Sequence, residues 1–259
     1  MILSDKKLLR QLTPAASLCA FILIWHLVSL CVNPDSLPSP GMVLQEAVRL
    51  FQMHIGGTSM LGHVGYSLRR VLIAFLLAIC MGLPLGLLMG WNPVCRKIVM
   101  PLFEILRPIP PIAWIPIAIL WLGVAEGSKI FICFVGSFVI MILNSYTGMR
   151  YVDPLLISAA RAFGASRVQQ FFNVAVPACL PSIFAGVQNS LSMSWMCVLA
   201  AEMIGAREGV GFLIIQGMDL NRPTMILVGM ILIGIVGSLL AALLRCLERF
   251  LCPWREELV

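Results

Sequence analysis

Six long apolar runs constrain this chain more than any other feature of its sequence. A helix needs about 20 mainly apolar residues to cross the hydrocarbon core of a bilayer. Only 12% of the 259 residues are charged and 60% are hydrophobic, whereas a soluble domain carries about 25% charged residues. We therefore expect an all-α integral membrane protein with six transmembrane helices. The expected spans are residues 15–32, 71–90, 98–122, 129–148, 177–205 and 224–247.

The first apolar run has a competing interpretation, because a secretory signal peptide also places basic residues before an apolar stretch. The run is long for a signal peptide, and no clear small-x-small cleavage site follows it. We therefore expect a retained first helix. Residues 1–14 are interpreted as a polar N-terminal segment, and residues 15–259 as a single transmembrane domain, because no polar stretch is long enough to bury a separate core.

The composition also argues against several functions. The net charge of +6 fits positive-inside bias and headgroup contact better than nucleic-acid binding. The nine cysteines and three histidines are scattered without CxxC or other metal-ligand spacing. The chain has no phosphate-binding glycine loop with its lysine, no HExxH and no GxSxG. We therefore expect no enzyme activity, no metal and no cofactor bound by this chain itself.

The basic residues predict which way the chain is oriented. With six spans both termini lie on one side, and basic residues gather on the cytoplasmic side of membrane proteins. Four basic residues fall on the opposite side: Arg49, Lys129, Arg207 and Arg222. Arg69 and Arg70, placed at the start of the second span, count against this orientation. The side on which Arg107 lies is ambiguous. Eleven of the 18 basic residues support cytoplasmic termini: Lys6, Lys7, Arg10, Arg96, Lys97, Arg150, Arg161, Arg167, Arg245, Arg249 and Arg255.

The connections between spans carry weaker patterns. Three prolines make the start of the 33–68 segment extended, and apolar residues at helical spacing from Val43 to Phe51 then predict a short amphipathic helix on the bilayer surface. In the second span Gly82, Gly86 and Gly90 predict close helix packing, with a bend at Pro84. Residues 206–223 are expected to form a loop.

The third expected span cannot be one regular helix, because Pro108, Pro110, Pro111 and Pro116 interrupt it. We expect a short helix, an extended or kinked break, and a second helix from about Ile112. Irregular backbone at membrane depth must be buried in protein or face a water-filled cavity. The break is therefore a candidate gate beside a pathway.

Two charges in this span, Glu104 and Arg107, have helical spacing that would let them pair. An ion pair at the level of the headgroups explains them as well as a gate does. Glu202, near the end of the fifth span, is also a candidate by its ionisable character. We favour a structural role for it, as the partner of a nearby polar group.

Residues 153–177 form the most sharply patterned polar interruption. Asp153 is placed to cap a helix that begins with Pro154, and Gly164 suits its end. Ser166 can cap a second helix, and Pro177 is expected to close the unit before the next span. The first helix carries one apolar face, made of Leu155, Leu156, Ala159, Ala160 and Phe163.

This unit resembles the cytoplasmic EAA loop of binding-protein-dependent ABC-transporter permeases. The family pattern is Glu-Ala-Ala, three residues, Gly, nine residues and Ile-x-Leu-Pro. The corresponding positions are Ser158-Ala159-Ala160, Gly164 and Val174-x-Val176-Pro177, with matching spacing throughout. Ser158 stands where the family has Glu, so a salt bridge from that position is not implied.

The resemblance covers most of the chain from Leu37 onward and points to one subgroup. The segment from Arg107 to Pro116, with Trp121-Leu122-Gly123 after it, is similar to permeases that import taurine, alkanesulfonates and nitrate. The segments 200–204 and 209–212 are similar to the same subgroup. The resemblance implies the fold of a type I ABC importer permease with a cytoplasmic coupling helix, located in the cell inner membrane.

The resemblance also implies partners: a separate ABC ATPase that uses the ATP, an extracytoplasmic solute-binding protein and a second permease copy. It implies ATPase contact by Leu155, Leu156, Ser158, Ala159, Ala160, Arg161, Phe163, Gly164 and Arg167. The apolar face of this unit either fills a cleft in the ATPase or packs on the chain's own helices, and a helix resting on the membrane surface is the alternative.

The polar and proline residues of the spans give the candidate pathway or gate: Arg107, Pro110, Pro111, Asn144, Ser194 and Glu202. For Glu202 a structural or outer-gate role is favoured over direct substrate contact, because its carboxylate would repel an imported anion.

Other functions stay open at this point. Within ABC importers the alternatives are a permease for a pyrimidine or thiamine precursor, or for bicarbonate. An ion-gradient-driven secondary transporter predicts matching broken helices in two repeated halves, and only the third span has the proline break. A membrane anchor without transport would need neither the loop spacing nor the broken span.

Overall fold

The structure is a computed structural model that describes residues 2–33 and 35–251, and most of these residues are helical. The helices of the first half are α1 (Ile2–Cys31), α2 (Pro40–Gln52), α3 (Met60–Trp91), α4 (Pro93–Leu106), the 3-10 turn η1 (Pro111–Trp114), α5 (Ile115–Leu122) and α6 (Glu126–Arg150). The second half has α7 (Pro154–Ala162), α8 (Arg167–Gln169), the π-helical turn η2 (Gln170–Ala175), α9 (Val176–Glu202), α10 (Val210–Asp219) and α11 (Pro223–Leu251). Strands β1 (His54–Ile55) and β2 (Thr58–Ser59) form one small antiparallel hairpin.

Four helical segments in the described chain are long and apolar enough to cross a membrane: Met60–Trp91, Glu126–Arg150, Arg167–Glu202 and Pro223–Glu248. A fifth span is available if α4 and the η1–α5 segment count as one broken element. The first expected span is present as an apolar stretch of α1, Ala16–Cys31, that is shorter than the others. The all-α membrane architecture is therefore confirmed, with four or five clear spans and a shorter apolar helix in place of the first.

The proline-rich third span is broken, as predicted. Helix α4 ends at Leu106, and the chain turns by 86° before Pro111–Leu122 continues as a 3-10 turn and a short helix. The predicted pairing of Glu104 with Arg107 is wrong. Both side chains are exposed, and no ion pair joins them in the described part of the chain. The break is therefore attributed to the prolines alone, as the sequence predicted.

Helices α3, α6 and α9 form the centre of the bundle, with α6 packed between the other two. The close approach of α3 to α6 depends on glycines of α3, as predicted from the sequence. A Cβ on Gly86 would lie 2.6 Å from the Ile142 carbonyl oxygen, and one on Gly90 would lie 2.6 Å from the Met149 Cβ. No hydrophobic effect drives helices together in lipid. Small residues let the two backbones approach closely, and dispersion then stabilises the contact.

Two connections predicted from the sequence have different bounds in the structure. Helix α3 starts at Met60, so the end of the supposed 33–68 connection and both Arg69 and Arg70 belong to a helix. The predicted 206–223 loop contains α10, whose buried face includes Val210, Leu213 and Ile214. Polar and glycine residues on either side of these apolar positions obscured the helix in the sequence.

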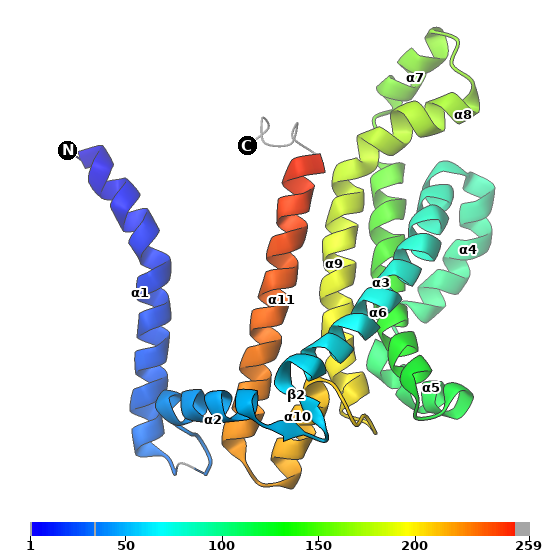
Figure 1. Cartoon of the computed structure of the whole chain (residues 1–259). Helices are drawn as coiled ribbons and strands as arrows, with labels where there is room; N and C mark the ends of the chain where they lie inside the picture. The colour runs from blue at the N-terminus through cyan, green and yellow to red at the C-terminus, as the bar shows by residue number, and fades with distance from the viewer. Residues whose placement is uncertain (1, 34, 252–259) are drawn as a thin grey trace.

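The predicted amphipathic helix is present as α2, but it buries a narrower face than expected. Val43, Glu46 and Leu50 are buried against the bundle, while Leu44 and Phe51 are exposed. The helix runs crosswise to α1 and α11 (Figure 1) and packs on α11. Its placement on a bilayer surface stays a prediction.

The expected stop at Pro177 is wrong, because the chain runs as one helical segment from Arg167 to Glu202. A proline in a regular helix clashes with the carbonyl four residues earlier. Here the π-helical turn η2 comes just before it, and the Val176 N–H donates to Phe171, five residues back. The wider turn makes room for the proline, so the second helix of the unit continues directly into the fifth span.

The two ends of the bundle differ in what they carry. The start of α1, the end of α11 and the α7–α8 unit lie at one end, and α2, the β-hairpin and α10 lie at the other (Figure 1). The α7–α8 unit projects beyond the long helices at its end. Any contact made by that unit is therefore far from the surface formed by α2 and α10.

The α3–α6 contact gives a test with opposite signs at two glycines of one helix. We expect Gly86→Ala to destabilise the protein by about 1–3 kcal/mol, because its Cβ meets the α6 backbone. Gly65→Ala, where no atom lies within 4 Å of the new Cβ, should be neutral or stabilising by about 0.5–1 kcal/mol. Thermal unfolding of the detergent-solubilised chain measures both, and equal melting temperatures would contradict the packing argument.

Candidate functional site

The α7–α8 unit is built by local hydrogen bonds that the sequence predicted. The Asp153 carboxylate accepts from the Leu155 N–H at 2.8 Å and caps α7. The Ser166 hydroxyl accepts from the Gln169 N–H, and the Gln169 side chain accepts in turn from the Ser166 N–H, which forms a capping box. Gly164 joins the two helices at φ +80°, a left-handed conformation that glycine adopts without strain.

The apolar residues of α7 point in two directions. Ile157 packs on the bundle in a cluster with Phe171 and Met149. Leu155 and Phe163, by contrast, are 72% and 92% exposed. These two exposed apolar groups lie on the part of the chain that projects beyond the long helices, which makes them candidates for a contact with another protein.

The other residues expected in this contact share the same unit. Leu156, Ser158, Ala159, Arg161, Gly164 and Arg167 are exposed and Ala160 is half-buried. The Ser158 hydroxyl donates to the Pro154 carbonyl at 2.8 Å, within its own helix. At the position where the EAA-loop family has Glu, this chain therefore has a serine whose hydroxyl donates to a backbone carbonyl of the same helix.

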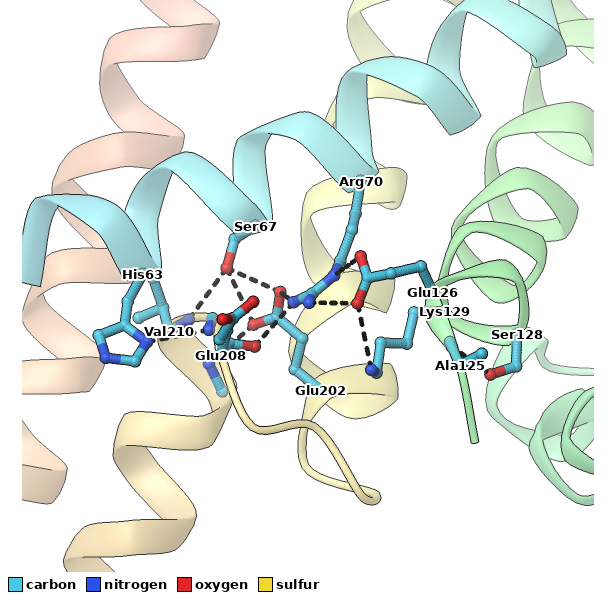
Figure 2. Close-up of polar contacts among 12 residues, drawn as sticks. His63, Ser67, Arg70, Ala125, Glu126, Ser128, Lys129, Glu202, Glu208 and Val210 are labelled. Atoms are coloured by element: carbon cyan, nitrogen blue, oxygen red, sulfur yellow. Dashed lines mark hydrogen bonds and ion pairs between the residues drawn. The ribbon is translucent and has the colours of Figure 1, made fainter. Parts of the chain in front are cut away.

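An ion-pair cluster lies at the other end of the bundle, with Glu126 47% exposed at its rim. Its centre is the buried Arg70 (Figure 2). Its Nη1 donates to Glu202 Oε1 at 2.7 Å, and its Nε and Nη2 donate to the two carboxylate oxygens of Glu126 at 2.8 and 2.6 Å. Lys129 Nζ adds a 3.3 Å bond to Glu126. Arg70 and Glu202 are each 1% exposed. Two cations and two carboxylates make the group neutral overall.

The loop before α10 is held by the same cluster. The Ser67 hydroxyl lies 2.7 Å from Glu202 Oε1 and accepts from the Val210 N–H at 2.9 Å. The Gly211 N–H donates to Glu202 Oε2, and the Glu208 carbonyl accepts from Arg70. These bonds join α3, α9 and the loop, while Glu126 joins α6, so one network ties three spans and a connection together (Figure 2).

Gly209 and His63 complete the network. Gly209 has φ +118° and packs its Cα against the Glu202 carboxylate, where a side chain has no room. Its N–H donates to His63 Nδ1 at 3.1 Å, so the imidazole proton is on Nε2, which donates to the Ile55 carbonyl at 3.0 Å. The histidine thereby connects the β-hairpin to the α9–α10 loop.

The structure does not bring the six gate candidates together. Arg107 and Pro110 are exposed, Pro111 and Asn144 are half-buried, and Ser194 and Glu202 are buried. In the described chain no hydrogen bond or ion pair joins any two of them. Only Glu202 belongs to the cluster.

The sequence interpretation missed the partners of Glu202. Arg70 was placed at the surface, at the start of a span, although it lies eleven positions into α3 with Ser67 and His63 on the same helix face. The available signal was an arginine inside an apolar helix with polar residues three and seven positions before it. An ionisable residue in a span is rare and marks a polar network or functional site.

Together the fold and the projecting unit define the class of protein: a multi-pass helical permease of a transport system. Residues 82–256 match the family model described as the binding-protein-dependent transport system inner membrane component. The chain belongs to this family.

Two relatives and one solved structure agree with that assignment. The chain is 32% identical to the taurine transport system permease protein of Escherichia coli over 252 residues, covering 96% of this chain and 92% of the relative. It is 34% identical to a nitrate import permease protein of Synechocystis over 254 residues, with 96% and 92% covered. The fold resembles a chain of an inward-facing MetNI methionine ABC transporter, with TM-score 0.64, 21% identity and coverage of 72% and 93%.

The ion-pair cluster predicts a strong effect at Arg70 and a weak one at its neighbour. Arg70→Met leaves the Glu202 carboxylate buried without its cation, which should cost about 3–5 kcal/mol. Arg69→Met removes the same charge from an exposed position of the same helix and should change stability little. The double variant R70M/E202M should recover much of the loss. Melting temperatures in detergent measure all three, and R70M melting like R69M would refute the role of the pair.

Proposed function

We propose that this chain is the permease subunit of an ATP-driven ABC importer that moves a small anion or sulfonate inward, of the taurine, alkanesulfonate or nitrate type. The observation that carries the proposal is the exposed apolar tip of α7, held on a capped helix–glycine–helix unit whose spacing matches the family's coupling loop. The printed names of two well-covered relatives support the substrate class.

A separate ATPase subunit supplies the energy in this proposal, because the chain carries no nucleotide-binding motif of its own. Leu155, Leu156 and Phe163 enter a cleft of that ATPase, and Arg161 and Arg167 contribute charge beside them. A second permease copy and an external solute-binding protein complete the assembly. The exposed surface of α2, the hairpin and α10 lies at the opposite end and is the side offered to the binding protein.

The shape of the fifth span explains how movement at the tip reaches the far end. Arg167–Glu202 is one helical segment of 36 residues, about 54 Å long at 1.5 Å per residue. It begins beside the tip of α7 and ends at Glu202 in the ion-pair cluster. A shift of the α7–α8 unit therefore displaces the Glu202 end directly, and we propose that the cluster forms the outer gate.

The orientation follows from the same assignment. The α7–α8 unit faces the cytoplasm, and the start of α1 and the end of α11 lie at that end (Figure 1). The distribution of basic residues supports this orientation. Arg70 no longer counts against it, because its charge is buried and paired.

The coupling role predicts a specific defect at Gly164. Replacing Gly164 with Val strains a left-handed position that has open space around it, and so changes the shape of the unit without a clash. In proteoliposomes with the ATPase and binding protein, we expect ATP hydrolysis to continue while uptake falls about tenfold or more.

Gly123→Val is the matched control, since Gly123 has φ +71° and equally open surroundings after α5, outside the surface offered to the binding protein. It should carry similar backbone strain and keep the wild-type ratio of uptake to ATP hydrolysis. Normal uptake by the Gly164 variant would show that the unit does not couple the two processes.

The substrate class has its own measurement. The reconstituted transporter should hydrolyse ATP several-fold faster when its binding protein is loaded with taurine, an alkanesulfonate or nitrate than when it is empty. Stimulation by a thiamine precursor or bicarbonate alone would replace the anion assignment while leaving the importer assignment intact. Uptake by the purified permease without any ATPase, driven by an ion gradient, would overturn the proposed function.

A further inference from the structure

A cavity of about 660 Å³, with several charged residues in its lining, opens between α4 and α6 at the end that carries the α7–α8 unit. It takes no part in the coupling unit or the ion-pair cluster. One wall comes from α4 and the other from the last turn of α6 and the residue after it. Its lining residues are Arg96, Lys97, Met100, Pro101, Glu104, Tyr146, Thr147, Arg150 and Tyr151.

The cavity has an excess of positive charge. Arg96, Lys97 and Arg150 face one carboxylate, that of Glu104, and none of these four residues forms an ion pair in the described part of the chain. Arg96 is half-buried, so its charge is partly removed from water. Arg150 is held in place by Tyr146, whose hydroxyl accepts from Nη1 at 3.2 Å and whose ring lies 6.0 Å from the guanidinium. Unpaired cations in a preformed hollow favour an anion.

An apolar stripe begins beside this charge and runs along the same helix. Val94, Ile98, Leu102 and Ile105 recur every three or four residues of α4 and are all between 61% and 69% exposed. They lie on α4 next to Arg96 and Lys97 but line no part of the cavity. A ligand that used both features would carry an anionic head and long apolar chains.

We propose that the α4–α6 cavity binds the phosphodiester headgroup of an anionic phospholipid, with the acyl chains lying along the exposed stripe of α4. Basic pockets between transmembrane helices bind such headgroups at the cytoplasmic side. A free phosphate or sulfonate shares the oxyanion chemistry but leaves the stripe without a function. The proposal needs only that the chain lies in a bilayer, so it stands apart from the transport assignment.

Binding is tested on the full-length chain in detergent, by native mass spectrometry with dioleoyl phosphatidylglycerol and dioleoyl phosphatidylcholine. We expect retention of phosphatidylglycerol over phosphatidylcholine, and at least a tenfold loss of that preference in R96Q/R150Q. The matched control is R161Q/R167Q, which removes two exposed arginines from the α7–α8 unit at the same end and should change binding less than twofold. K97Q/R150Q, which changes only exposed side chains, replaces the first variant if that variant does not fold.

Two further arms separate the lipid from a free oxyanion. Inorganic phosphate or methanesulfonate at about 10 mM, roughly ten-thousandfold above a Kd of about 1 μM, should leave the lipid bound. I98N/L102N, on the stripe, should weaken phosphatidylglycerol binding while keeping the fold. Displacement by the free ions, or equal losses in the cavity and control variants, would overturn the lipid site.

Discussion

The ion pair between Arg70 and Glu202 is the interaction on which the rest of the architecture depends. A buried charge is costly in a low-dielectric interior unless a partner and further hydrogen bonds compensate it. Here the compensation comes from α3, α6, α9 and the loop before α10 at once. The cluster therefore determines where three spans sit relative to one another at that end. At the other end glycine contacts between α3 and α6 perform the same task through backbone proximity.

The two ends of the bundle are therefore held together by different kinds of interaction. Dispersion holds the helices at the glycine contacts, whereas directional hydrogen bonds between charged groups hold them at the cluster. The Glu202 end of the long Arg167–Glu202 segment sits in the network, and its start sits beside the projecting unit. In the proposed coupling, a displacement of that start acts on these hydrogen bonds at the far end of the segment.

Much of the fold was predictable because local rules decide it. Asp153, Gly164 and Ser166 specify caps and a left-handed turn within a few residues, and the prolines before Trp114 specify a break. The cluster was not predictable in this way, since Arg70 and Glu202 are 132 positions apart and only packing brings them together. Pro177 failed as a stop signal because the π-helical turn before it relieves the steric clash that usually ends a helix at a proline.

The cluster also removes an apparent contradiction in the proposed import of an anion. A bare carboxylate at the mouth of the pathway would repel the cargo, and that argument disfavoured Glu202 as a substrate contact. In the structure Glu202 is neutralised by Arg70, while Arg70 donates four hydrogen bonds, to Glu126, Glu202 and the Glu208 carbonyl. The closed cluster therefore presents no net charge that would repel or hold a small anion. If the cluster opens as the proposed outer gate, Arg70 loses these partners and its positive charge becomes available to the anion.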